Sequence, residues 1–401
     1  MLLYDTRTRR RVPLRLAHTV RIYTCGITPY ASTHLGHAFT YSSVDALVRW
    51  LEHRGHRVRS VRNITDVDDD ILRIARERGA DYLELGRDEV ERFDRDLDAL
   101  GLRRPDAVPR PTQQITAIRT AVRGLVDGGS AYALSDGRIY FDTQAARPQW
   151  GALSRLGPRE MLEQFAVKGG DPDAPGKRNP VDFLLWQPSA PDEPSWPAPL
   201  DALPPGRPGW HIECSAMAME ELGGVLDVHA GGQDLIFPHH EAEIVQSEHL
   251  TGQGPFVRAW FYVGMVALDG EKMSKSLGNL VFVADLLEHH DGRAVRRYLL
   301  SHHYRQGWEF DEAALAESAG IYKTWTDAAA GDGERPDLEA RVEAAMDDDL
   351  DTPAAIAALD EAARVGAGAT LRRMAAVLGF DLSPGFLGAQ RSSSVRGEPA
   401  S

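Results

Sequence analysis

The apolar and polar positions near the start of the chain predict a strand, a helix and a second strand. Thr19–Cys25 has the pattern of a strand that runs into a glycine-containing turn. The apolar residues of Ser42–His53 share one helical face, at Val44, Leu47, Val48 and Leu51. Arg57–Ile64 predicts another strand. This order is typical of the start of a parallel α/β sheet.

The middle of the chain changes pattern. From Asp81 to about Asp142 it predicts two amphipathic helices and a short hairpin with Asp136 and Gly137 in its turn, which we interpret as an insertion. The region 169–209 is dense in proline and glycine and predicts an ordered loop. Strand patterns return at Val225–Ala230 and Trp260–Val266.

The C-terminal part predicts helices after Ala313. Thr352 is expected to cap one helix, with Pro353 as its first residue. A last helix is predicted over Thr370–Leu378, and the Ser/Gly/Pro-rich tail 382–401 is expected to be disordered.

Composition narrows the function classes. A chain of 401 residues allows two or three domains, and no apolar run is long enough for a membrane span. The N-terminal segment lacks the apolar core of a secretory signal, so we predict a cytoplasmic protein, with a transit peptide as the alternative. A net charge of −14 argues against a broad nucleic-acid surface, although the arginine-rich first 62 residues could still bind phosphates locally.

The first candidate motif is His34-Leu35-Gly36-His37, which follows the first predicted strand and precedes the first helix. In a parallel sheet this position presents a helix N-terminus to phosphates. The glycine allows close approach of a nucleotide, and His34 and His37 can stabilise phosphate charge. Four residues alone also occur without any nucleotide role.

The second motif is Lys272-Met273-Ser274-Lys275-Ser276, which follows a late strand. Two lysines three residues apart can neutralise a leaving pyrophosphate. The alternative is a solvated surface loop. Together the two motifs resemble those of class I aminoacyl-tRNA synthetases, which form aminoacyl-adenylates. The resemblance implies ATP and magnesium as cofactors, with His34, His37, Lys272 and Lys275 as catalytic residues.

The third motif concerns the two cysteines, Cys25 and Cys214. From the number of cysteines alone, the simplest interpretation is that both are buried, inert thiols. However, Cys214 lies in the motif Gly-Trp-His-Ile-Glu-Cys, and His239 follows in Phe-Pro-His-His-Glu. Thiolates and imidazole are natural zinc ligands, and three of them leave a position open for a substrate thiol. The alternative is a closed site with Glu243 as fourth ligand.

From about Val20 to Phe380 these stretches resemble cysteinyl-tRNA synthetases and the related mycothiol-biosynthesis cysteine ligases, which join cysteine to the amine of glucosaminyl-inositol. The resemblance implies a Rossmann-like α/β fold with an inserted α+β connective region and a helical C-terminal domain. We place the two halves of the nucleotide-binding catalytic domain at 1–80 and 200–285, the insertion at 81–199 and the helical domain at 286–381.

The ligases are favoured by Pro29, by Gly169-Gly170-Asp171-Pro172 and by the absence of an anticodon-binding region after Phe380. His229, Glu243 and Asn179 to Phe183 match the synthetase pattern instead, and Val167-Lys168 replaces the Glu-Arg usual in the ligases. A ligase for another amine, a short cysteinyl-tRNA synthetase and a non-catalytic cysteine or adenylate sensor remain alternatives. The favoured partners are L-cysteine, ATP and a small amine, for a monomer that does not use tRNA.

Residue matching implies a set of adenylate-binding residues. They are Cys25, Gly26, Ile27, Thr28, Thr40, Asn63, Ile64, Thr65, Trp210, His229, Gly232, Gln233, Asp234, Val266 and Lys275. Thr28 would accept from the substrate ammonium, Asp234 would hold a ribose hydroxyl, and Trp210 would wall the cysteine pocket. For Asn63 and Thr65, strand-end capping is the alternative role. His229 and Asp234 are candidates for the base in amide formation.

Overall fold

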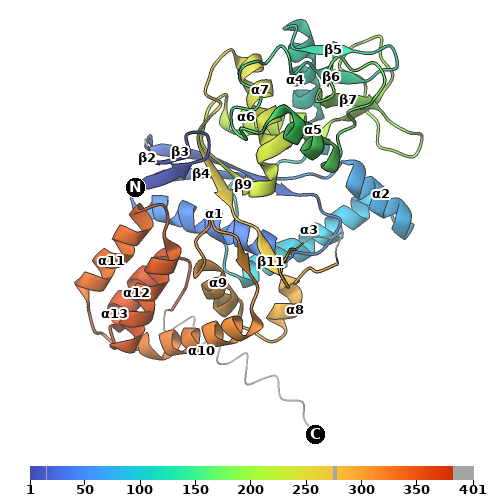
Figure 1. The fold of residues 1–401 in the computed structure, drawn as a ribbon. Coiled ribbons are helices and arrows are strands. Elements are labelled where there is room, and N and C mark those ends of the chain that lie inside the picture. The colour runs from blue at the N-terminus through green and yellow to red at the C-terminus, as the bar shows by residue number, and fades with distance from the viewer. Residues whose placement is uncertain (15, 274–277, 383–401) are drawn as a thin grey trace.

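The computed structural model describes residues 1–14, 16–273 and 278–382. Its centre is a four-stranded parallel sheet in the order β10-β9-β3-β4. The strands are β3 (Thr19–Ile27), β4 (Arg57–Ile64), β9 (Leu226–Gly232) and β10 (Val257–Val263). Helix α1 (Leu35–His53) packs on one face and α6 (Trp210–Leu222) on the other (Figure 1). The predicted parallel α/β sheet is therefore confirmed.

Two predictions near this sheet need correction. The first helix begins at Leu35 rather than Ser42, because His34 caps it and the next residues continue the helix into the apolar stripe. The expected strand Trp260–Val266 is divided between β10 and β11 (Val266–Leu268). Gly264 separates them, where a Cβ would lie 2.3 Å from the carbonyl oxygen of Gln306.

The segment between the two halves of the sheet folds around an antiparallel sheet in the order β5-β6-β7-β8. Its strands are β5 (Ala131–Ala133), β6 (Ile139–Phe141), β7 (Leu184–Pro188) and β8 (Gly206–Pro208). The hairpin with Asp136 and Gly137 is confirmed. The loop predicted for 169–209 was wrong in part, since β7 and β8 are short strands that pair with sequence-distant neighbours.

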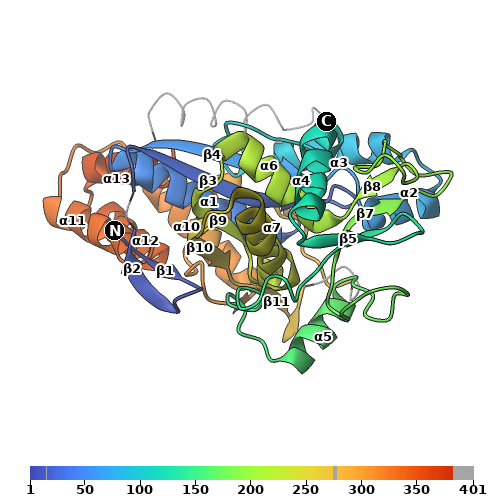
Figure 2. The same ribbon diagram turned by 90° about the horizontal axis from the view of Figure 1, so that it is seen from above.

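Helices surround both sheets (Figures 1 and 2). They are α2 (Asp69–Arg78), α3 (Tyr82–Ala99), α4 (Ile115–Asp127), α5 (Pro158–Val167), α7 (Glu241–Thr251), α8 (Val283–Leu287) and α9 (Gly292–Leu300). Short turns lie at η1 (Pro111–Gln113), η2 (Gln233–Leu235) and η3 (Ile236–His240). The core of α3, through Val90, Phe93 and Leu97, is continuous with that of α1 and the parallel sheet.

The C-terminal part is helical, as predicted, with α10 (Glu312–Ala328), α11 (Pro336–Asp347), α12 (Thr352–Arg364) and α13 (Gly368–Val377). The cap of α12 is Asp351 and not Thr352, because the Asp351 carboxylate accepts from the amide of Ala354 at 3.0 Å. Of the predicted tail, 383–401 lie outside the described residues, whereas Leu382 is buried.

Two smaller sheets complete the described fold. The N-terminal hairpin joins β1 (Leu2–Asp5) to β2 (Arg10–Pro13), and a small sheet has the order β12-β11-β13. Its outer strands are β12 (Glu271–Lys272) and β13 (Trp308–Glu309). No described helix is long and apolar enough to cross a membrane.

Candidate active site

The carboxyl end of β3 leads directly into the nucleotide motif. His34 caps α1, its Nδ1 accepting from the amide of His37 at 3.4 Å, and the His34 and His37 rings stack with centroids 3.7 Å apart. The motif therefore forms the first turn of the helix rather than preceding it. Both imidazoles lie at a helix N-terminus, where anions are favoured.

The turn after β3 depends on a close approach to β4. A Cβ on Gly26 would lie 1.6 Å from the carbonyl oxygen of Asn63, so only glycine fits there. The Asn63 side chain accepts from the amide of Gly26 at 2.8 Å and donates to Thr65 Oγ1 at 3.1 Å. Thr65 in turn donates its amide to the carbonyl of Ile27. These bonds hold Cys25 and Gly26 in place.

A cleft of about 930 Å³ opens at this edge of the sheet. It brings together nine of the predicted residues, namely Cys25, Gly26, His34, His37, Thr40, Gly232, Asp234, Val266 and Lys272. Such a volume suits a nucleotide-sized ligand. The position of the cleft also fits a ligand site, because open α/β sheets bind ligands beyond the carboxyl ends of their strands.

Five further predicted adenylate residues do not line the cleft. Thr28 Oγ1 donates to Asp68 Oδ2 at 2.9 Å, and Gln233 donates to the carbonyl of Arg305 at 3.0 Å. Ile64 is fully buried at the end of β4. These three, with Asn63 and Thr65, support the turns around the cleft and do not line its described wall.

The two motif lysines differ in what the structure describes. Lys272 is exposed in β12, and its Nζ lies 3.7 Å from Asp234 Oδ2 across the cleft. Lys275 lies outside the described residues, as does the rest of 274–277. The described lysine therefore faces the carboxylate expected to hold the ribose.

Four buried side chains from four elements meet behind the cleft wall at Cys25, and we call this buried cluster the floor of the cleft. They are Cys25 of β3, Cys214 of α6, His239 of η3 and Glu243 of α7, and their ligand atoms all lie within 4.8 Å of one another. Cys25 Sγ is 3.9 Å from Cys214 Sγ and 3.6 Å from Glu243 Oε1. The sequence predicted this quartet with Glu243 as the optional fourth member.

The chemistry of the quartet fits zinc. Burial raises the pKa of the Cys25 thiol, and Cys214 and Glu243 raise it further. Burial also lowers the pKa of His239, which keeps its imidazole neutral, the form that binds metals. A divalent cation bound here would displace the thiol protons and stabilise the resulting thiolates and the carboxylate, and sulfur, nitrogen and oxygen donors are those zinc prefers.

A second set of donors overlaps the first. Cys25, His229, His240 and Glu243 also place their ligand atoms within 4.8 Å of one another. His229 Nε2 lies 2.9 Å from Glu243 Oε2, and His240 Nε2 lies 3.3 Å from Cys25 Sγ. Sequence reasoning did not include His240, since the His-His pair gives no sign of which imidazole faces inward. His229 belongs to this floor and does not line the cleft.

The imidazole of His239 is held by two neighbours. Trp210 stacks on it with ring centroids 4.1 Å apart, and His211 Nδ1 lies 2.8 Å from His239 Nδ1. For Nε2 of His239 to bind a metal, its proton must sit on Nδ1 and be donated to His211. An Nδ1 of His211 that accepts this proton would leave the lone pair of His239 Nε2 facing Glu243.

For zinc loaded into the quartet, replacing His211 with leucine is expected to speed its loss to a chelator by about 10- to 100-fold, because the orienting hydrogen bond is removed. A chromogenic chelator measures the rate. His211→Asn, whose side-chain oxygen can accept the same bond, is the matched control. Equal rates for the leucine variant and the wild type would contradict this role for His211.

Sequence reasoning missed the other end of the cleft. Tyr30, Asp70, Arg73 and Arg78 line it, three of them from α2. Tyr30 Oη donates to Asp70 Oδ2 at 3.4 Å, and burial, helped by Asp70, raises the pKa of Tyr30 to about 12. For the three residues of α2, the position on the first helix after β4, at the ligand-binding edge, was the signal available in the sequence.

Comparison with known proteins places this geometry in context. The family model for the class I (C) tRNA synthetase catalytic domain matches residues 12–320. A relative from Streptosporangium roseum is 45% identical over 89% of this chain and 87% of its own length, and one from Thermobifida fusca is 46% identical over 89% and 86%. Both carry the name L-cysteine:1D-myo-inositol 2-amino-2-deoxy-α-D-glucopyranoside ligase.

Solved structures agree on the fold. Mycobacterium tuberculosis methionyl-tRNA synthetase in complex with methionyl-adenylate has a TM-score of 0.62 and 17% identity, over 95% of this chain and 86% of that one. The leucyl enzyme of Agrobacterium radiobacter, in its ternary complex, has a TM-score of 0.64 and 11% identity, over 97% and 86%. At these identities the similarity concerns the fold alone.

Proposed function

The chain belongs to the class I (C) tRNA synthetase family, in its group of cysteine:glucosaminyl-inositol ligases, and on this premise we propose that it is an ATP-dependent cysteine–amine ligase. It activates L-cysteine as cysteinyl-AMP and transfers the cysteinyl group to an amine. The favoured acceptor is the amine of glucosaminyl-inositol. The observation that carries this proposal is the buried quartet of Cys25, Cys214, His239 and Glu243 at the floor of a nucleotide-sized cleft.

The quartet supports selection of cysteine. Zinc held there would accept a substrate thiolate as a further ligand, whereas the hydroxyl of serine is a poorer one. Cys25 belongs both to the quartet and to the cleft wall, so a thiol at this point lies next to the nucleotide space. Trp210, stacked on His239, would close the side of a small pocket.

In the first step the carboxylate of cysteine attacks the α-phosphorus of ATP, which enters with magnesium, and pyrophosphate leaves. His34 and His37 at the N-terminus of α1 donate to the phosphate oxygens, and Lys272 and Lys275 neutralise the departing charge. Asp234, at the far wall of the cleft, would hold the ribose hydroxyls.

In the second step the acceptor amine attacks the carbonyl carbon of the adenylate, AMP leaves, and the nitrogen loses a proton. Of the two groups considered for that proton, His229 is fully buried against Glu243, whereas Asp234 lines the cleft. Asp234 is therefore the more accessible of the two. We further propose that the enzyme acts as a monomer and without tRNA.

The proposal predicts ATP–pyrophosphate exchange that depends on cysteine and not on serine. Incubation with cysteine, ATP and glucosaminyl-inositol is expected to give the amide, detected by mass, together with AMP. Absence of exchange would refute cysteine activation. Acylation of tRNA without formation of the amide would instead identify a short cysteinyl-tRNA synthetase.

A second candidate is a ligase for a different amine. The observation that favours it concerns Glu243, which matches the synthetase pattern. Its Oε1 lies 3.2 Å from His239 Nε2 within the quartet. Exchange without conversion of glucosaminyl-inositol, followed by amide formation with another primary amine, would select this candidate.

A further inference from the structure

We propose that Lys168 is an additional active-site cation, which binds the phosphate of the adenylate from the connective insertion. This inference rests on the proposed function for the nature of the ligand. It goes beyond that function because Lys168 belongs to neither of the two nucleotide motifs and was known from the sequence only as a departure from the usual Glu-Arg pair.

The first observation is the place where the Lys168 side chain ends. Its Nζ donates to the backbone carbonyl of Asp234, 66 residues away, and Asp234 lines the cleft. The Nζ of Lys272 lies 3.7 Å from Asp234 Oδ2. Two ammonium groups from different segments thus converge on one cleft residue, and an ammonium has three protons to donate.

The second observation is the electrostatic environment of the Lys168 ammonium group. Partial burial lowers the pKa of Lys168, and the charge of Lys272 lowers it further, while Asp234 raises it. The charge of Lys168 also acts on His239 and His240 at the floor of the cleft. Lys168 therefore lies near Asp234 and within electrostatic reach of Lys272 and of the floor of the cleft. The phosphoryl–acyl linkage of an adenylate would occupy that region.

The third observation is that the backbone fixes Lys168 in this position. Helix α5 packs against η3, which carries His239, and Lys168 ends the helix by donating its amide to the carbonyl of Gln164 at 3.1 Å. Gly169 follows with a φ of +88°. A Cβ on Gly170 would lie 2.3 Å from the buried ring of Phe165, so this turn requires glycine.

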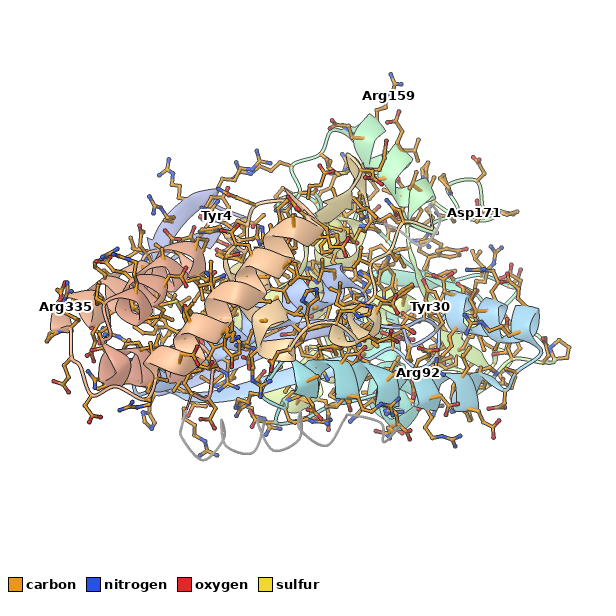
Figure 3. The ribbon with its side chains drawn as sticks, turned by 90° about the horizontal axis from the view of Figure 1, so that it is seen from below. Tyr4, Tyr30, Arg92, Arg159, Asp171 and Arg335 are labelled. Carbon is orange, nitrogen blue, oxygen red and sulfur yellow. The ribbon has the colours of Figure 1, made fainter. Side chains whose placement is uncertain are left out.

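Charged residues on either side of Lys168 point in a different direction from its side chain. Arg159 and Asp171, on either side of this segment, point away from the molecule (Figure 3). Both α5 and β11 lie on the front side in Figure 1, along the lower edge of Figure 2. Lys168 is the charged residue of this segment that turns inward to Asp234. A merely solvated lysine would not be partly buried beside a second lysine, because the like charges repel.

The test compares two nucleotides that differ only in the phosphate. Lys168→Met is expected to raise the Kd for AMP about tenfold and to leave the Kd for adenosine unchanged, as loss of one charge-assisted contact would. Lys168→Arg, which keeps the charge, should stay within about threefold of wild type for AMP. Lys323→Met, an exposed lysine of α10, is the matched control and should change neither affinity. Isothermal titration calorimetry measures all of them.

Two results would overturn the inference. Unchanged AMP affinity in Lys168→Met would show that the ammonium makes no phosphate contact. Equal weakening of AMP and adenosine would show that the side chain only supports the wall. Failure of the proposed function appears in a different measurement, since a wild type that discriminates AMP from adenosine through Lys168 but lacks cysteine-dependent exchange would refute the ligase and retain the phosphate contact.

Discussion

Replacing Cys214 with serine is expected to remove bound zinc and cysteine-dependent ATP–pyrophosphate exchange together. Cys214 is 1% exposed, and its sulfur lies 3.9 Å from that of Cys25 in the quartet. A serine hydroxyl is a harder and weaker ligand than a thiolate. Because loss of an outer-sphere contact already costs about 10- to 100-fold in metal affinity, loss of a ligand should exceed that. Metal analysis after dialysis and the exchange assay give the two readouts.

Glu220→Gln is the control on the same helix, since Glu220 is exposed and belongs to neither donor set. Thermal melting monitors whether each variant folds. A serine variant that keeps full exchange without metal would refute the zinc–thiol proposal. A folded variant that loses exchange but keeps one zinc would show that Cys214 serves the reaction without holding the metal.

The two overlapping donor sets make a further comparison decisive. Cys25 and Glu243 belong to both sets, so only their partners distinguish them. If zinc uses Cys214 and His239, then His239→Asn should lose metal as Cys214→Ser does, while His240→Asn retains it. If His240→Asn loses the metal and His239→Asn retains it, the metal is assigned to the set that contains His229 and His240.

Local sequence patterns predicted much of the fold. The strands β3, β4 and β9 follow from their apolar runs, and the nucleotide motif follows from its place after β3. The strands β7 and β8 were missed because they are short, contain proline and gain their identity from partners far along the chain. Periodicity cannot detect a strand that is defined only by its neighbours.

The site, like the fold, has parts that local sequence patterns predict and parts that depend on contacts between distant residues. Cys25 and Glu243 lie 218 residues apart, and no spacing rule brings them together. The resemblance supplied that grouping, and the fold gives it a physical basis through β3, α6, η3 and α7. The contact between Lys168 and Asp234 was not predictable, because it depends on how the connective insertion packs on η3. Long-range side-chain contacts of this kind require the tertiary structure.

Replacing Arg296 with methionine is expected to destabilise the protein by about 3 to 5 kcal/mol. Arg296 is fully buried in α9, where its guanidinium pairs with Asp45 of α1 and donates to the carbonyl of Leu378 at 2.8 Å. Removal of the guanidinium leaves the Asp45 carboxylate buried with only part of its partners. The denaturation midpoint in urea measures the loss.

The exposed pair of Arg341 with Glu361 provides the matched control, because Arg341→Met removes an arginine from the same helical region with a side chain that is 54% exposed. That change should cost less than about 1 kcal/mol. In the double variant, Asp45→Asn with Arg296→Met, neutralising the stranded carboxylate should recover part of the stability. An Arg296→Met variant as stable as Arg341→Met would show that the buried pair does not join α1 to the helical domain. Since His34 caps α1 and His37 lies in its first turn, the attachment of α1 to α9 also bears on how firmly the phosphate-binding turn is held.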